Sequence, residues 1–217
     1  MRALVLDSSS VAVVVSVVDV SVSPRVIAQQ TAVAAHAHGE LLAPAIAACL
    51  ESAGAAVAAV VAGIGPGPFT GLRVGLVSAA AFGYARALPT YGVCSLDGIG
   101  ASLPGTVLVA GDARRREIYW AVYADGVRQG DPAVDRPADV LARLCDNRPD
   151  AMAGAGARMY ADVLGLPMLD RDFPDPHALA GLAAERIRSM APSETLVPAY
   201  LREPDATPPV LHGAPLV

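Results

Sequence analysis

The strongest constraint on the fold is a series of short, β-branched apolar runs near the start of the chain. Residues 3–6 and residues 11–20 form two such runs, separated by the polar sequence Asp-Ser-Ser-Ser, and residues 26–31 form a third. Apolar runs bounded by polar turn residues are typical of β-strands. We therefore predict that the chain opens with three consecutive strands.

A helix is expected after the third strand. Apolar residues recur there at the spacing of one helical face, and the pattern stops at Gly54, a residue type that commonly ends helices. The residues on this face are Leu42, Ile46, Cys49 and Leu50.

Strand, helix and strand then alternate. Residues 58–64 are apolar throughout, which predicts a strand buried on both faces. Thr70 is a suitable N-cap for a helix over residues 71–88, and residues 91–95 predict a further strand. By analogy, three strands followed by helix, strand, helix and strand indicate an α/β unit of the ribonuclease-H-like type.

The second half of the chain predicts a shorter version of this unit. Strands are expected at residues 106–111 and 117–123, helices near residues 139–145 and 179–190, and turns and loop at residues 125–137.

Three parts follow from this pattern. We expect a first half at residues 1–97, a smaller second half at residues 98–203, and a tail at residues 204–217. The tail has several prolines and no periodicity, so we expect it to be extended or disordered.

Composition excludes several classes of protein. All sixteen basic residues are Arg, which excludes a Schiff-base lysine and the phosphate-binding lysine of a P-loop. A net charge of −5 gives no global basic field, so any RNA contact is expected to be local or shared with a partner. The apolar runs are far shorter than the roughly 20 residues that span a bilayer, and the first residues do not resemble a signal peptide. We expect a cytoplasmic protein without membrane contact.

Cysteine and histidine positions do not indicate a metal site. Cys49, Cys94 and Cys145 lie far apart without a C-x-x-C pair, so we expect reduced, buried thiols rather than disulfides or a zinc site. His36 and His38 form an H-x-H pair, but no third ligand lies near them in the sequence.

The most specific feature is the glycine-rich segment GPGPFTGLRVG at residues 65–75. Glycines allow close backbone approach, and a helix start exposes N–H groups that can hold an anion, although the spacing matches neither G-x-G-x-x-G nor Walker A. The alternative is that the glycines let two helices pack closely while Phe69 fills a core. The chemistry of the residues alone favours this packing interpretation.

The same segment closely resembles the signature of the bacterial TsaB family, also called YeaZ, whose members are needed to make threonylcarbamoyladenosine beside the anticodon of tRNA. Four further segments resemble that family in the same order: LVLDSS at 4–9, HGELLAP at 38–44, DARRREIY at 112–119 and PAYLR at 198–202. Together they extend over nearly the whole chain.

The resemblance implies an α/β, actin-like (ASKHA) fold of two ribonuclease-H-like halves, the second shortened. It also implies a non-catalytic scaffold subunit with no cofactor of its own. Such a subunit binds a TsaD-like catalytic subunit, which supplies the metal and the chemistry, works with a TsaE-like ATPase, and meets tRNA through the complex.

An actin-like ATPase or kinase is the main alternative, using Asp7 and the loop at residues 65–71. Asp7, Ser8 and Ser9 can orient phosphate or magnesium at the first turn, as equivalent loops do in actin-like ATPases. Turns of this composition are also common for backbone capping alone, which would make these three residues a vestigial nucleotide site. A protease is a weaker alternative, because no Ser or Cys lies in a nucleophile-elbow pattern with an assignable base.

Arg114, Arg115 and Arg116 form a local positive cluster. It can contact tRNA phosphate or a carboxylate of a partner, or it can pair with Glu117 and nearby acids on a solvated surface. The sequence leaves both interpretations open.

The two helices of the first half are the expected partner interface. The second is apolar on nearly every side over residues 74–82, more than one buried face requires, which indicates that a partner covers the remainder. We expect a homodimer in isolation, exchange to a heterodimer with a TsaD-like partner, and weakening of both by Leu42→Glu or Leu76→Glu. The expected interface residues are Leu42, Ile46, Cys49, Leu50, Phe69, Leu72, Arg73, Leu76, Ala80 and Gly83.

Overall fold

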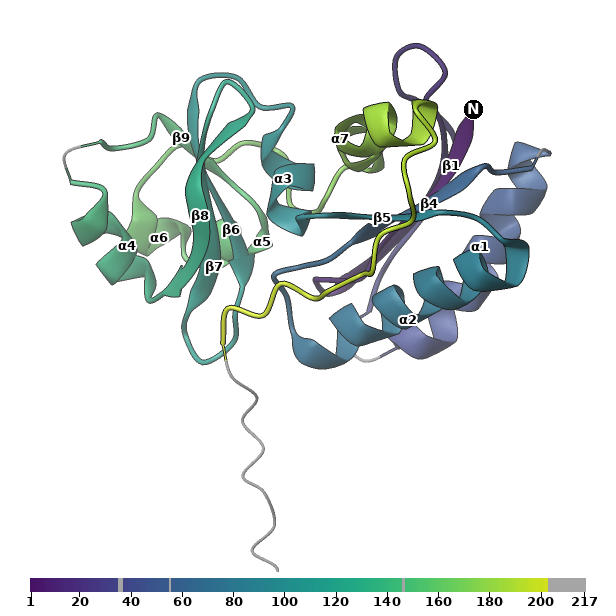
Figure 1. Cartoon of the computed structure of the whole chain (residues 1–217). Helices are drawn as coiled ribbons and strands as arrows, with labels where there is room; N and C mark the ends of the chain where they lie inside the picture. The colour runs from purple at the N-terminus through teal and green to yellow at the C-terminus, as the bar shows by residue number, and fades with distance from the viewer. Residues whose placement is uncertain (35–36, 55, 146, 203–217) are drawn as a thin grey trace, which may run out of the picture.

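The computed structural model describes residues 1–34, 37–54, 56–145 and 147–202, and within this range two α/β lobes lie side by side (Figure 1). The predicted tail at residues 204–217 lies outside the described residues, as does His36. No helix of the described residues is long and apolar enough to cross a bilayer.

The first lobe is built on a five-stranded sheet of order β3-β2-β1-β4-β5. β1, β2 and β3 are antiparallel neighbours, whereas β4 and β5 run parallel to β1. All five predicted strands of the first half are confirmed, with ends shifted by one or two residues. Their bounds are β1 (Arg2–Asp7), β2 (Ala12–Asp19), β3 (Arg25–Val33), β4 (Ala59–Gly63) and β5 (Thr90–Val93).

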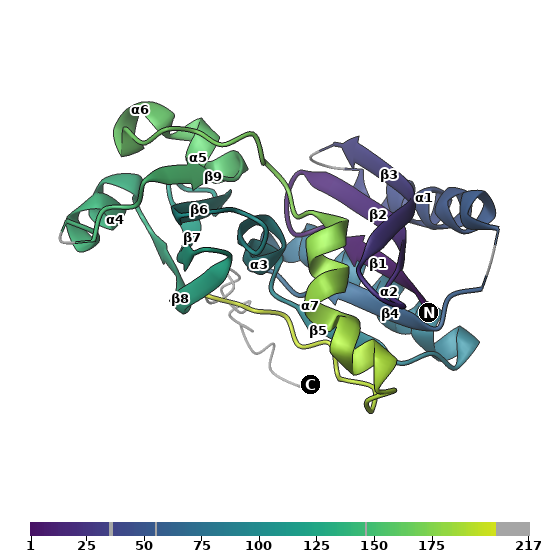
Figure 2. The ribbon, with the colours of Figure 1, turned by 90° about the horizontal axis from the view of Figure 1, so that it is seen from above.

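Helices cover both faces of this sheet because its central strands are apolar on both sides. Successive side chains of a strand point to opposite faces. Leu4 and Leu6 of β1 therefore pack toward α1 (His38–Ala53) and α2 (Phe69–Arg86), while Ala3 and Val5 pack toward α7 (Pro176–Arg188). Viewed from above, α7 lies over the sheet (Figure 2).

The first two helices follow the prediction with one correction. α1 ends at Gly54, which adopts the left-handed conformation with φ of 58°, as expected for a helix terminator. α2 begins at Phe69 with Pro68 at the N-cap, so the prediction that Thr70 caps this helix is wrong. Pro68 is extended, with ψ of 133°, and the chain turns helical directly after it.

The second lobe repeats the first in reduced form. Its sheet has the order β8-β7-β6-β9, with β6, β7 and β8 antiparallel and β9 parallel to β6. This matches β3-β2-β1-β4 without a fifth strand, so the expected shortening is confirmed. The strands are β6 (Thr106–Asp112), β7 (Ile118–Ala124), β8 (Val127–Asp135) and β9 (Ala151–Ala153).

Four short helices flank this second sheet. α3 packs on one face, while the other three belong to the core on the opposite face. Their bounds are α3 (Ser95–Gly100), α4 (Pro137–Arg143), α5 (Ala155–Met159) and α6 (Ala161–Leu164).

Two predictions for the second half are wrong. Residues 125–137 are not turns and loop throughout, because β8 occupies most of them as an edge strand, where Gly130 and Pro132 are tolerated. The helix expected near residues 179–190 is confirmed as α7 with shifted ends, and Asp175 caps it by accepting a hydrogen bond from the His177 backbone N–H at 3.0 Å. This helix, α7, packs on the first sheet, so residues 98–203 do not form one separate lobe.

The cysteines differ in exposure. Cys49 is buried as expected, but Cys94 is half-buried and Cys145 is exposed, so the prediction of three buried thiols is wrong. Cys145 lies two residues after the end of the short helix α4.

The glycine-rich segment packs against the turn after β1. A Cβ atom at Gly67 would collide with the Ser9 carbonyl oxygen, and one at Gly71 would lie 2.8 Å from the Ser8 carbonyl oxygen. The Ser8 hydroxyl also donates to the Gly71 carbonyl oxygen at 2.8 Å. The glycines therefore admit this turn, which corrects the expectation that they serve packing between two helices.

We expect Gly67→Ala to lower the free energy of unfolding by roughly 1–3 kcal/mol, because the added methyl group meets rigid backbone rather than a side chain. The control is Gly39→Ala in α1, where a Cβ atom meets nothing within 4 Å, and it should be neutral or slightly stabilising. Urea unfolding followed by circular dichroism measures both. Equal stability of the two variants would contradict the close packing.

Candidate functional site

Asp7 lies at the carboxyl end of β1 and is 1% exposed. One carboxylate oxygen, Oδ1, accepts hydrogen bonds from the Ser9 backbone N–H at 2.9 Å and from the Ser9 hydroxyl at 2.8 Å. The other, Oδ2, accepts from the Ser95 hydroxyl at 2.6 Å. Burial raises the pKa of Asp7, and the hydrogen bonds from Ser95 and Ser9 offset this only in part.

Ser95 links this carboxylate to the glycine-rich segment. Its hydroxyl accepts a hydrogen bond from the Gly65 backbone N–H at 3.0 Å, and Gly63 at the end of β4 packs directly against the Asp7 carboxylate. Asp7 thus holds together the ends of β1 and β4 and the start of α3. No local sequence pattern indicates this role of Ser95, because its partners lie 30 and 88 positions away along the chain.

A narrow cleft lies between the two lobes. Ser9 and Pro66 of the first lobe line it together with Tyr119 and Asp172, and its volume is about 100 Å³. Sites that enclose a cofactor or drug-sized ligand usually span about 300–1,000 Å³. The cleft itself is smaller than this range, and the buried Asp7 carboxylate bonds to its own protein neighbours.

Ser8, Ser9 and His38, which lie beside this cleft, form hydrogen bonds within the protein. The Ser8 hydroxyl donates to Gly71, and the Ser9 hydroxyl donates to Asp7. His38, which is 8% exposed, donates through Nε2 to the Ser10 backbone carbonyl oxygen at 2.7 Å rather than to a hydroxyl group. Among the described residues, no three His, Cys, Asp or Glu side chains are grouped to hold a metal ion.

The expected interface helices direct most of the predicted residues inward. Their apolar stripes face the sheet of the first lobe, so the buried members pack in the core of this chain. Glu at position 42 or 76 would place a carboxylate in the core and destabilise the fold, so weaker association of either variant would not by itself identify an interface. Ile46 and Leu50 are half-buried against the same core. The buried members are Leu42, Cys49, Leu72, Leu76 and Gly83.

The outer face of α2 carries a different set of apolar side chains. Val77 is 66% exposed and Tyr84 is 92% exposed, with Ala80 between them also exposed. An apolar groove follows these residues and is closed on its other side by Leu196 and Pro198. The apolar excess of α2 indicated this surface, but Val77 and Tyr84 themselves were missed.

Phe69 and Arg73, at the start of α2, contact the C-terminal part of the chain. The Phe69 ring is half-buried, and its centre lies 4.6 Å from that of Tyr200. The Arg73 guanidinium lies 5.3 Å from the Phe69 ring centre and donates through Nε to the Tyr200 hydroxyl at 2.8 Å. Phe69 therefore does not fill a core of the first lobe, and both residues hold Tyr200.

The three-arginine cluster forms the turn between β6 and β7. Arg114, Arg115 and Arg116 are exposed and have φ values of 60°, 55° and 64°, a left-handed backbone that costs non-glycine residues about 1 kcal/mol or more each. Asp112 supports the turn by accepting from the Arg114 backbone N–H at 2.7 Å and pairing with its guanidinium at 3.3 Å. Glu117 pairs with Arg202. A strained turn thus presents three guanidinium groups at the surface.

Comparison with known proteins places this geometry in a family. A family model described as "TsaD: tRNA N6-adenosine threonylcarbamoyltransferase" matches residues 25–196. An uncharacterized protein of Mycobacterium tuberculosis is 49% identical over 186 residues, which cover 84% of this chain and 83% of that protein. YeaZ from Pseudomonas aeruginosa has a TM-score of 0.74 at 27% identity, covering 92% of this chain and 99% of that one.

A more distant structure resembles the chain in fold alone. The activator of 2-hydroxyisocaproyl-CoA dehydratase from Clostridium difficile, solved with bound ADPNP, has a TM-score of 0.51 at 12% identity, covering 88% of this chain and 97% of that one. The two repeated sheets and these matches establish the actin-like fold of two ribonuclease-H-like halves. With the family model and the YeaZ structure, they show that the chain belongs to the TsaB (YeaZ) family.

Proposed function

We propose that this protein is a non-catalytic scaffold subunit that binds a TsaD-like catalytic subunit and supports threonylcarbamoyl transfer to tRNA. The observation that carries the proposal is the closure of the Asp7 site, where the protein itself uses both carboxylate oxygens. A TsaE-like ATPase and tRNA complete the working complex, which places the protein in the cytoplasm with its substrate.

The enzyme alternatives fit the geometry less well. An actin-like ATPase or kinase that uses Asp7 and the loop at residues 65–71 needs a carboxylate open to ligand, and Asp7 is 1% exposed. A protease needs a hydroxyl group paired with a base, and the His38 ring donates to a backbone carbonyl oxygen instead.

The exposed face of α2 is the proposed partner surface. It presents a contiguous set of exposed apolar side chains, Val77, Ala80 and Tyr84, and such patches commonly mark interaction sites. These side chains border the groove closed by Leu196 and Pro198. We propose that a TsaD-like partner covers this face. In its absence the same face pairs with a second copy about a two-fold axis, giving a homodimer.

We expect Asp7→Asn to leave threonylcarbamoyl transfer by the complex assembled from purified subunits within roughly tenfold of wild type, because the side chain positions structure rather than chemistry. Asn retains the size of the side chain and an acceptor for Ser9. Removal of a required catalytic group costs about a hundredfold or more. A loss of that size, with assembly intact, would refute the scaffold proposal.

We expect Val77→Glu to weaken both the homodimer and the complex with a TsaD-like partner by more than roughly tenfold, since an unpaired carboxylate would be buried at the contact. Sedimentation velocity measures both associations, and circular dichroism checks folding. The control is Val127→Glu on β8, because Val127 is 65% exposed against 66% for Val77. If both variants associate like wild type, α2 is not the interface.

The turn at Arg114 to Arg116 between β6 and β7, here named the arginine turn, is the proposed tRNA contact of this subunit. Replacing Arg114 and Arg116 by Ala should weaken tRNA binding by the complex. The slope of the logarithm of the binding constant against the logarithm of salt concentration should become shallower by roughly one to two, as expected for the loss of two phosphate contacts. Arg143→Ala is the control, because Arg143 is an exposed arginine on α4 that pairs with Asp135 at 3.1 Å. An unchanged salt slope would assign the turn to a protein contact or to structure.

A further inference from the structure

The chain after α7 returns across the molecule toward the second lobe. We name residues 191–202 the C-terminal strap. Figure 1 shows the strap leaving α7, passing beside β5 and reaching the end of the β6–β7 hairpin. It therefore contacts elements of both lobes.

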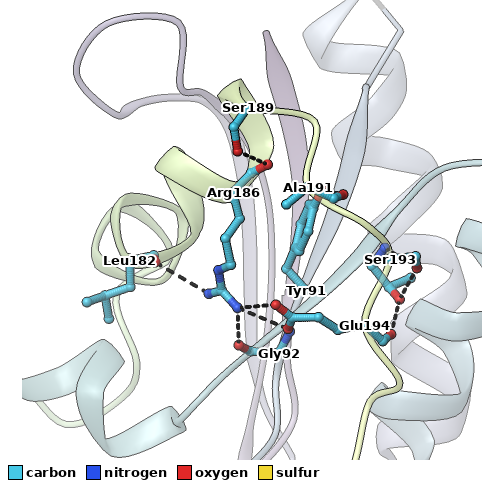
Figure 3. A network of polar contacts seen from close by, with 9 residues as sticks. Tyr91, Gly92, Leu182, Arg186, Ser189, Ala191, Ser193 and Glu194 are labelled. Atoms are coloured by element: carbon cyan, nitrogen blue, oxygen red, sulfur yellow. Dashed lines mark hydrogen bonds and ion pairs between the residues drawn. The ribbon is translucent and has the colours of Figure 1, made fainter.

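The first part of the strap is fastened along the edge of β5, as Figure 3 shows. The Thr90 backbone N–H donates to the Ser193 hydroxyl at 3.0 Å, and the Gly92 backbone N–H donates to Glu194 Oε2 at 3.0 Å. Arg186 of α7 donates to both carboxylate oxygens of Glu194, at 2.8 and 3.0 Å. Charge-assisted contacts of this kind are stronger than neutral hydrogen bonds, so the strap is anchored firmly to the first lobe.

The middle of the strap is fastened beside the start of α2. The Ala199 backbone N–H donates to the Ile64 carbonyl oxygen at 2.8 Å. The Tyr200 ring packs against the Phe69 ring with their planes tilted by 41°, and the Tyr200 hydroxyl accepts from Arg73 at 2.8 Å. The strap thus stays attached to the first lobe as far as Tyr200.

The end of the strap crosses to the second lobe. Arg202 donates through Nη1 to the Ala113 carbonyl oxygen at 3.1 Å and forms an ion pair with Glu117. Ala113 and Glu117 flank the arginine turn and are themselves joined by a backbone hydrogen bond of 3.1 Å. Only one residue separates the Tyr200 contact in the first lobe from the Arg202 contact in the second.

Both other crossings between the lobes lie near α3. The chain passes from β5 through α3 into β6, and it returns to α7 where the Asp175 backbone N–H donates to the Gly98 carbonyl oxygen at 2.9 Å. Figure 1 places α3 between the lobes and the end of the strap at the far end of the β6–β7 hairpin. Covalent crossings at one end and a non-covalent contact at the other are the arrangement of a hinge with a latch.

We propose that the C-terminal strap is a latch that holds the two lobes closed over the cleft between them. Opening about α3 moves the β6–β7 hairpin away from α2, which breaks either the Arg202 contacts or the Tyr200 contacts. With the latch fastened, the cleft keeps its volume of about 100 Å³. This inference does not depend on the proposed scaffold function, because it concerns the chain alone.

The test measures the distance between spin labels on the two lobes. Labels are attached at Ala81→Cys on α2 and Val163→Cys on α6, both exposed positions, with Cys145→Ser removing the exposed native thiol. Dilution with unlabelled protein removes distances between chains. In Arg202→Ala, the fraction of molecules with a longer distance between the labels is expected to rise roughly tenfold over wild type. The reason is that the substitution removes a charged hydrogen bond and an ion pair.

Tyr200→Ala releases the other attachment and should produce the same longer distances. The control is Arg2→Ala, since Arg2 donates to the Ala53 carbonyl oxygen at 3.0 Å inside the first lobe, and its distances should match wild type. Wild-type distances in both folded strap variants would overturn the latch. Equal lengthening in the control would also overturn it, because the labels would then report general loosening.

Discussion

The buried carboxylate of Asp7 is the interaction on which the rest of the structure depends. A buried carboxylate costs several kcal/mol unless hydrogen bonds compensate for its lost hydration, and here Ser9 and Ser95 supply the donors. The glycine-rich segment packs against the same turn, with Gly67 against the backbone of Ser9 and the Gly65 N–H bonded to Ser95. The polar turn after β1 and the glycine-rich segment are therefore one structural unit.

This unit occupies the edge of the sheet where open α/β folds usually bind ligands, at the carboxyl ends of parallel strands. Here the hydroxyl groups of Ser9 and Ser95 bond to the Asp7 carboxylate instead, and the small cleft between the lobes lies beside them. The remaining features do little for a lone chain: an apolar face around Val77 and Tyr84, and a strained turn at Arg114 to Arg116. A strained turn and an exposed apolar face both lower the stability of a single chain, so their presence favours a role in an assembly.

The sequence predicts the strands of the first lobe well, because short β-branched runs between turn residues have few alternatives. It fails at β8, where Gly130 and Pro132 resemble a loop although an edge strand accepts them. It also fails to orient the helices. Periodicity indicates that Leu72 and Leu76 share a face, but not that this face covers the sheet while Val77 points outward. Ser95 and Arg202 act across long separations along the chain, and no local pattern reveals them.

The five segments that resemble the TsaB family contact one another although they lie far apart in the sequence. His38 of the first-helix motif bonds to Ser10 beside the first-strand motif, and Arg73 of the glycine-rich motif bonds to Tyr200 of the C-terminal motif. Arg202 of that same motif bonds to Ala113 in the arginine-turn motif. The five motifs therefore form one connected set of contacts from β1 through α2 to the second lobe. The strap thus joins α2 directly to the turn at Arg114 to Arg116, because Tyr200 and Arg202, which contact these two elements, are separated by a single residue.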